Sequence, residues 1–122
     1  MNMLNLVGSL IVYHVTPEEN IASIWMKGIC PSYARGKMGA SWYISKHRIE
    51  WALIHTSVAH HVQIDELAVC AVHVDAVDLY KFFKPGYYYS FTTLQIESAT
   101  PAMFFLHNYG MDDDERFETG TR

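Results

Sequence analysis

The 122-residue sequence predicts one α+β domain, on three observations. Two segments, which begin near residues 9 and 41, each have the pattern of a strand followed directly by a helix. A third segment, LAVCAVHV at residues 67–74, is apolar at nearly every position, as is typical of a central strand buried on both faces. Half of the residues are hydrophobic, which suffices for one buried core at this length.

In the first unit, SLIVY at residues 9–13 is expected to form a strand that ends at His14. Thr16 is expected to cap a helix, because Pro17 suits the first helical position and Glu19 the third, where a carboxylate closes a capping box. The helix would bury one apolar face and end at a glycine and a proline: Ile21, Ile24 and Trp25 on the face, then Gly28 and Pro31.

In the second unit, a loop at residues 32–40 leads into an aromatic strand, SWYIS, at residues 41–45. Ser45 is placed to cap a second helix over residues 46–61. After the apolar strand, a Pro-Gly turn is expected to lead into one or two strands within residues 87–96.

Composition and charge narrow the organisation of the chain. Residues 110–122 carry five acidic and two arginine side chains, so we expect an acidic, mobile tail there and a single domain over residues 1–109. No apolar run is long enough to span a bilayer and the start lacks a basic signal-peptide segment, so a cytoplasmic protein without membrane contact is expected. Cys30 and Cys70 are expected in the core, and the histidine spacing (His55, His60, His61) predicts no metal site.

Two features remain open from the residues alone. The segment between Asn20 and Ile49 carries five basic side chains and no acidic one, which is typical either of a solvated face or of a site for a phosphate-containing ligand. His14, between a strand and a helix start, is either a turn residue that bonds a local carbonyl or a site residue whose ring donates a hydrogen bond to a ligand hydroxyl.

The chain resembles the ADP-ribosyltransferase superfamily in the order of three segments: YHVT, then a capped helix IASIWMKGICP, then WYIS before a second helix. The resemblance is to its histidine-tyrosine branch, which includes poly-ADP-ribose polymerases, diphtheria-type toxins and DNA-modifying toxins, and it covers roughly residues 10–104. It implies two small, mostly antiparallel sheets that form a cleft, with flanking helices. It also implies NAD as the substrate and a protein or nucleic acid as the acceptor.

The same resemblance implies a role for individual residues. His14 would bond the ribose beside nicotinamide, the backbone of Val15 would hold the carboxamide, and Tyr43 would stack on the nicotinamide ring. The pocket would include four further residues, the last two at its mouth: Thr16, Ser45, Arg35 and Lys37. From the residues alone, Tyr43 is more simply a core aromatic side chain and Ser45 a helix cap.

The resemblance also concerns a catalytic carboxylate. Transfer of ADP-ribose passes through an oxocarbenium-like state, which a nearby carboxylate stabilises. Gln95 and Glu97 resemble the glutamine-x-glutamate pair of several ADP-ribosyltransferases, so Glu97 is the expected carboxylate. In a second register, set by the segment ESATPAMF, the catalytic position falls at Thr92 and holds no carboxylate.

Three functions are therefore predicted as alternatives. An NAD-dependent ADP-ribosyltransferase would use His14, Tyr43 and Glu97, with the carboxylate facing His14. An enzyme similar to RNA 2'-phosphotransferases would need three basic side chains to converge on a phosphate: Arg35, Lys37 and Arg48. A catalytically inactive module on the same fold would bind a nucleotide or a protein partner.

Overall fold

The computed structural model describes residues 8–33 and 39–108. In chain order, its strands and α-helices are β1 (Ser9–Pro17), α2 (Ile21–Lys27), β2 (Ser41–Ile44), α3 (Ile49–His60), β3 (Leu67–Asp75), β4 (Tyr80–Lys81), β5 (Tyr87–Ser90), β6 (Ser98–Pro101) and α4 (Ala102–Asn108). Short 3-10 helices lie between them: η1 (Glu18–Asn20), η2 (Pro31–Tyr33), η3 (Lys46–Arg48), η4 (Ile64–Glu66) and η5 (Ala76–Asp78). The strands form one six-stranded sheet in the order β4-β5-β2-β1-β3-β6, and its pairs are antiparallel.

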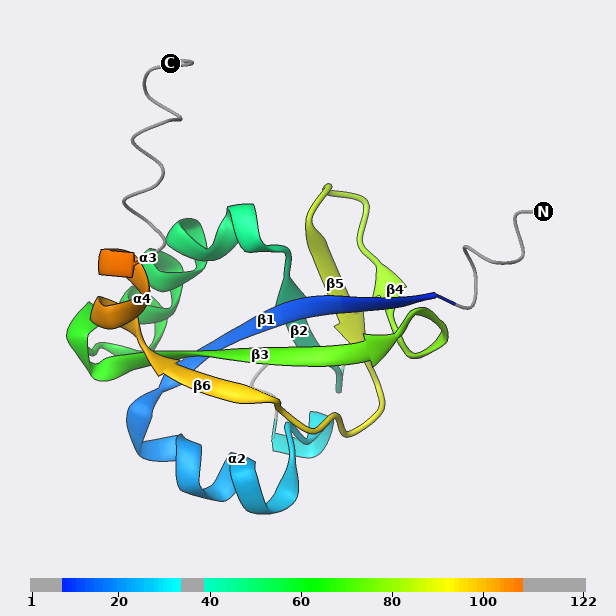
Figure 1. Ribbon diagram of the computed structural model, residues 1–122, viewed down its shortest axis with the longest axis horizontal. Coiled ribbons are helices and arrows are strands. Elements are labelled where there is room, and N and C mark those ends of the chain that lie inside the picture. The colour runs from blue at the N-terminus through cyan, green and yellow to red at the C-terminus, as the bar shows by residue number, and fades with distance from the viewer. Residues whose placement is uncertain (1–7, 34–38, 109–122) are drawn as a thin grey trace.

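The sheet has a narrow junction at its centre. β1 and β3 are paired along all nine residues of each strand, whereas β1 and β2 are in register at one pair, Tyr13 and Ile44. Figure 1 shows β2 and β5 running steeply across the direction of β1 and β3. The α+β class is confirmed, but the prediction of two sheets is wrong, because the Tyr13–Ile44 pair joins two three-stranded parts into one sheet.

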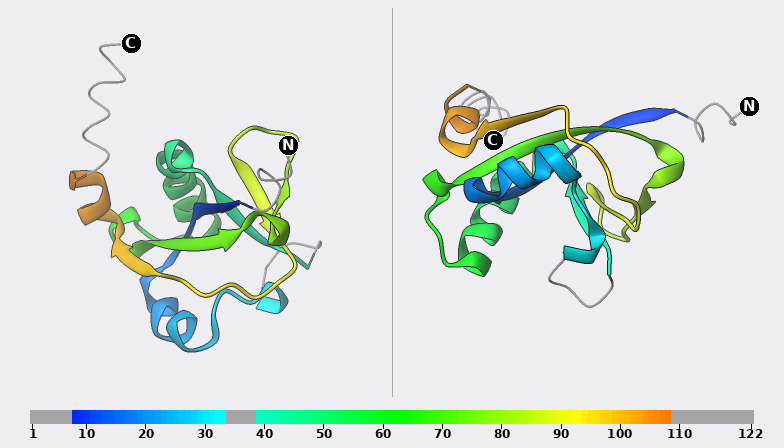
Figure 2. Two further views of the ribbon diagram at one scale, coloured as in Figure 1. Left: turned by 45° about the vertical axis from the view of Figure 1, so that its right-hand side comes forward. Right: turned by 90° about the horizontal axis from the view of Figure 1, so that it is seen from below.

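The two faces of the sheet pack against different helices. Val12 of β1 and Cys70 of β3 belong to a core against which α2 packs, together with Leu94 and Ile96. On the other face, Val69 belongs to a core that includes side chains of α3 and α4. Figures 1 and 2 show α2 and α3 on opposite sides of the sheet. Because side chains alternate along a strand, odd and even positions of β1 meet different helices.

The first helix begins later than predicted. β1 continues through Pro17, and α2 starts at Ile21 after a 3-10 turn. Thr16 is not a helix cap: it is a buried strand residue whose hydroxyl accepts a hydrogen bond from the Asn20 side chain at 3.0 Å. The long pairing with β3 keeps Thr16 in extended conformation, since it lies opposite Ala68 in the ladder.

The second strand and helix lie where predicted, but the cap does not. Ser45 precedes η3, and its hydroxyl bonds Nδ1 of His47 at 2.9 Å instead of a helix N–H group. β3 is confirmed as an interior strand between β1 and β6. Its side chains from Leu67 to Cys70 are buried, whereas His73 near its end is exposed.

The last third of the domain differs most from prediction. β5 ends at Ser90, whose hydroxyl accepts a hydrogen bond from the Thr92 N–H, and the chain then bends away instead of extending through residue 96. β4, which spans two residues, β6 and α4 were not predicted. The predicted tail at residues 110–122 lies outside the described residues. Within the described part of the chain, no helix is long and apolar enough to cross a membrane.

Candidate functional site

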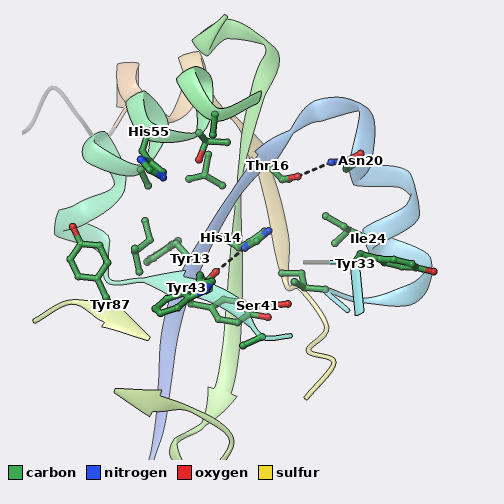
Figure 3. A pocket seen from close by; sticks show the side chains of 18 of the residues that line it. Tyr13, His14, Thr16, Asn20, Ile24, Tyr33, Ser41, Tyr43, His55 and Tyr87 are labelled. Atoms are coloured by element: carbon green, nitrogen blue, oxygen red, sulfur yellow. Dashed lines mark hydrogen bonds between the residues drawn. The ribbon is translucent and has the colours of Figure 1, made fainter. Parts of the chain in front are cut away.

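A pocket of about 770 Å3 lies where β1 and β2 separate beyond their junction. Its walls come from β1, from α2 and the chain after it, from β2, from α3, and from the chain that leads into β5. Figure 3 shows α2 and α3 on either side of it, with side chains of β1 and β2 between them. The pocket thus collects groups from both sides of the sheet at the place where its strands are no longer hydrogen-bonded to each other.

His14 lies at this junction and bridges the two strands. Its Nδ1 lies 2.9 Å from the backbone carbonyl oxygen of Trp42 (Figure 3). A side chain of β1 is thus hydrogen-bonded to a backbone carbonyl of β2, just beyond the registered pair of the two strands. The carbonyl can only accept, and Nδ1 therefore carries the proton. The turn-residue interpretation of His14 is wrong, because the carbonyl it bonds belongs to another strand.

The electrostatics of His14 follow from this position. Burial lowers its pKa, the nearby His60 acts in the same direction, and the Trp42 carbonyl acts against them. The ring is therefore neutral at physiological pH, with its proton on Nδ1 and a lone pair on Nε2. Contrary to the sequence-based expectation that the ring donates to a ligand, His14 offers the pocket a hydrogen-bond acceptor.

Tyr43 meets His14, as predicted, but its ring is not open for stacking. The two ring centroids are 5.6 Å apart, and Tyr43 is 1% exposed within the core under α2. Burial raises the pKa of its phenol, and the nearby Ser41 hydroxyl lowers this pKa by a smaller amount. Within the described residues the Tyr43 hydroxyl has no hydrogen-bond partner. Tyr43 is thus a core aromatic side chain that packs against the His14 ring at the base of the pocket.

Of the other residues that the resemblance assigns to NAD, only some line the pocket. Val15 and Thr16 line the pocket, and Asn20, which bonds Thr16, lines it too. Ser45 is not among the lining residues. The two basic residues expected at the mouth, Arg35 and Lys37, lie outside the described residues.

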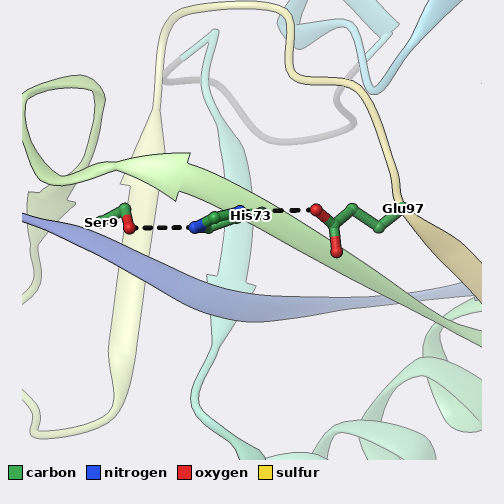
Figure 4. A network of polar contacts seen from close by, with 3 residues as sticks. All are labelled: Ser9, His73 and Glu97. Atoms are coloured by element: carbon green, nitrogen blue, oxygen red, sulfur yellow. Dashed lines mark hydrogen bonds and ion pairs between the residues drawn. The ribbon is translucent and has the colours of Figure 1, made fainter.

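Glu97 is not brought to His14. Its carboxylate lies 3.4 Å from Nδ1 of His73, whose Nε2 is 2.9 Å from the Ser9 hydroxyl, and both partners of the ion pair are about half-exposed (Figure 4). His14 stands opposite Cys70 in the β1–β3 ladder, and His73 is an odd number of positions further along β3. Glu97 and His14 therefore belong to opposite faces of the sheet.

Thr92, the catalytic position in the second register, is not brought to the pocket either, since it is exposed and is not a lining residue. None of the described residues that line the pocket is Asp or Glu. No group of three or more His, Cys, Asp or Glu side chains in the described ranges could hold a metal ion. The pocket is thus equipped to bind a ligand through aromatic, amide, hydroxyl and imidazole groups.

Sequence reasoning missed one wall of the pocket, the face of α3 that carries Trp51, His55 and Thr56. Trp51 stacks on His55 with centroids 4.8 Å apart and remains 45% exposed. The sequence does indicate a second contact face on α3, because the helix has apolar residues beyond the buried ones, Ile49, Ala52 and Leu53. Lys84 and Tyr87, which line the same side, had no recognisable signal.

Comparison of the chain with protein-family models, with curated proteins and with solved structures found no match.

Proposed function

We propose that the protein binds NAD or a related nucleotide in this pocket. The observation that carries the proposal is the His14–Trp42 hydrogen bond, which leaves a histidine acceptor at the junction of β1 and β2. A ribose hydroxyl is a suitable donor to this nitrogen. The surrounding walls are rich in aromatic and apolar side chains, and the volume of the pocket falls in the usual range for small-molecule sites, about 300–1,000 Å3.

Transfer of ADP-ribose to a macromolecule is the second candidate, favoured by the contact of His14 with Tyr43, the pair that the resemblance assigns to NAD. This reaction calls for a carboxylate beside the ribose. Glu97 pairs with His73 on the other face of the sheet, and the described lining residues include no carboxylate. Binding without transfer is therefore the function that the geometry supports best.

Titration calorimetry of NAD into the wild type and into His14→Asn tests the proposal. The Asn amide keeps a donor near the position of Nδ1, so it can still bond the Trp42 carbonyl, but it lacks the acceptor Nε2. We expect NAD affinity to fall about 3- to 10-fold, the effect of one lost hydrogen bond. His107→Asn on α4, outside the pocket lining, is the matched control and should bind NAD like the wild type.

Two results would change the conclusion. A wild type that shows no NAD binding at millimolar concentration overturns the proposal. Incubation with labelled NAD and a lysate, followed for nicotinamide release and label transfer, decides on the second candidate. If label is transferred and Glu97→Gln abolishes the transfer, ADP-ribose transfer replaces binding as the function.

A further inference from the structure

Two basic side chains converge on one tyrosine ring at the edge of the pocket. Cζ of Arg48 lies 5.4 Å and Nζ of Lys84 5.5 Å from the ring centroid of Tyr87. Lys84 and Tyr87 line the pocket, whereas Arg48, which immediately precedes α3, contacts the tyrosine ring from outside the lining. A cation is attracted to the face of an aromatic ring, but two cations near the same ring also repel each other.

Neither of the two cations forms an ion pair within the described part of the chain. Neither Arg48 nor Lys84 is paired there with a carboxylate, and Nε of Arg48 is enclosed without a hydrogen-bond partner. Because this N–H is enclosed, it is not open to a ligand, and what the pair offers an anion is the positive charge of its two side chains.

The two side chains are held together by the backbone. The carbonyl of Gly86 accepts a hydrogen bond from the Ser45 N–H at 2.9 Å, which fixes the turn that carries Lys84 against the segment that carries Arg48. The fit is close: a Cβ atom on Gly86 would lie 2.8 Å from Oγ of Ser45 and 3.0 Å from Cγ of Arg48. The backbone segments that carry the two cations are therefore held against each other before a ligand arrives.

We infer that Arg48 and Lys84 form a subsite for the phosphate groups of the ligand. This inference rests on the proposed function in placing a nucleotide in the pocket. An arginine fork and a lysine ammonium are the side chains that bind phosphate oxygens best, and together they neutralise the charge of a diphosphate. In this inference a nucleotide extends from the His14 acceptor at its ribose toward Lys84 in the pocket lining, with Arg48 beside the same tyrosine, just outside the lining.

Inorganic pyrophosphate, titrated into the labelled protein and followed by amide NMR shifts, tests the subsite without a nucleotide. Lys84→Ala and Arg48→Gln should each weaken pyrophosphate binding roughly tenfold, the loss of one charge-assisted contact. Lys81→Ala on β4 is the matched control, because Lys81 is exposed, lies outside the pocket lining and is not one of the two cations over Tyr87, and it should bind like the wild type. If Arg48→Gln does not fold, the exposed Lys84 decides the question alone.

The outcomes separate this inference from the proposed function. If pyrophosphate binds Lys84→Ala as it binds the wild type, or does not bind the wild type, the subsite is overturned even where NAD binds. If Lys84→Ala weakens pyrophosphate binding as expected and NAD does not bind, the subsite stands and the nucleotide proposal falls.

Discussion

A single neighbour sets the chemistry of His14. The Trp42 carbonyl lies 28 positions along the chain, fixes the proton on Nδ1 and leaves the other ring nitrogen as an acceptor. Of the two interpretations that the sequence leaves open, the one that places His14 in a site assigns it the opposite hydrogen-bonding role. The reason is that the partner belongs to another strand and is brought near by a junction one residue pair wide.

The lowered pKa of His14 predicts a pH dependence of stability. Its ordinary value is 6.5, and burial lowers it in the folded protein. Below that pH the unfolded chain binds a proton that the native chain does not, so the contribution of His14 to stability decreases as pH falls. Urea unfolding from pH 8 to pH 5 should show a steeper loss for the wild type than for His14→Asn, by at most about 1.4 kcal/mol per pH unit. Parallel curves would mean that His14 titrates alike in both states.

At the scale of elements, the pocket arises from the way β2 meets β1. Strands that stayed in register would close the space between them with backbone hydrogen bonds, but β1 and β2 share one registered pair and then separate. β1 itself is held on its other side, because β3 pairs with it along its whole length. One side of β1 thus provides a rigid support, and the other provides open backbone and side chains for the site.

The turn before β5 gives a prediction at this scale. Gly86 has φ of +87°, and a Cβ there would come within 3.0 Å of Ser45 and Arg48. Gly86→Ala should lower the unfolding free energy by about 1–3 kcal/mol, through left-handed strain and this contact. Gly39→Ala is the matched control, since Gly39 has φ of +72° and no atom within 4 Å of the added Cβ. Thermal unfolding of both variants measures the difference, and equal losses would show that the turn shifts without cost.

At the scale of the whole molecule, the sheet separates two cores, and the pocket opens at the junction between them. Its two walls, α2 and α3, lie on opposite sides of the sheet (Figure 2). A ligand in the pocket therefore touches elements that belong to both cores. Binding would stabilise the molecule as a unit, by an amount that grows with the logarithm of one plus the ratio of ligand concentration to dissociation constant.

The reactivity of the two cysteines can test whether a ligand occupies the pocket. Cys30 is half-buried and lines the pocket, whereas Cys70 is fully buried, and burial raises the pKa of Cys70 to about 12. Iodoacetamide should therefore modify Cys30 in the native protein and leave Cys70 unmodified. Saturating NAD should slow the modification several-fold, as measured by intact mass over time.

Controls make this test specific. Cys30→Ser should show no modification while folded. Modification of native Cys70 would contradict the buried core, and a rate that bound NAD does not change would place the ligand away from Cys30.

The sequence by itself determined the α+β class, the two strand-to-helix units and the central strand, because these depend on local periodicity and on turn residues. It also singled out His14 and Tyr43, each at the end of a predicted strand near a predicted helix. The tertiary structure decided how these parts meet. Strand pairing joined the sheet into one and kept Thr16 extended, and alternation along β3 placed Glu97 on the face away from His14. The same long-range packing brought Arg48 to Lys84 across Tyr87, which no local pattern encodes, because the register between distant segments depends on the whole core.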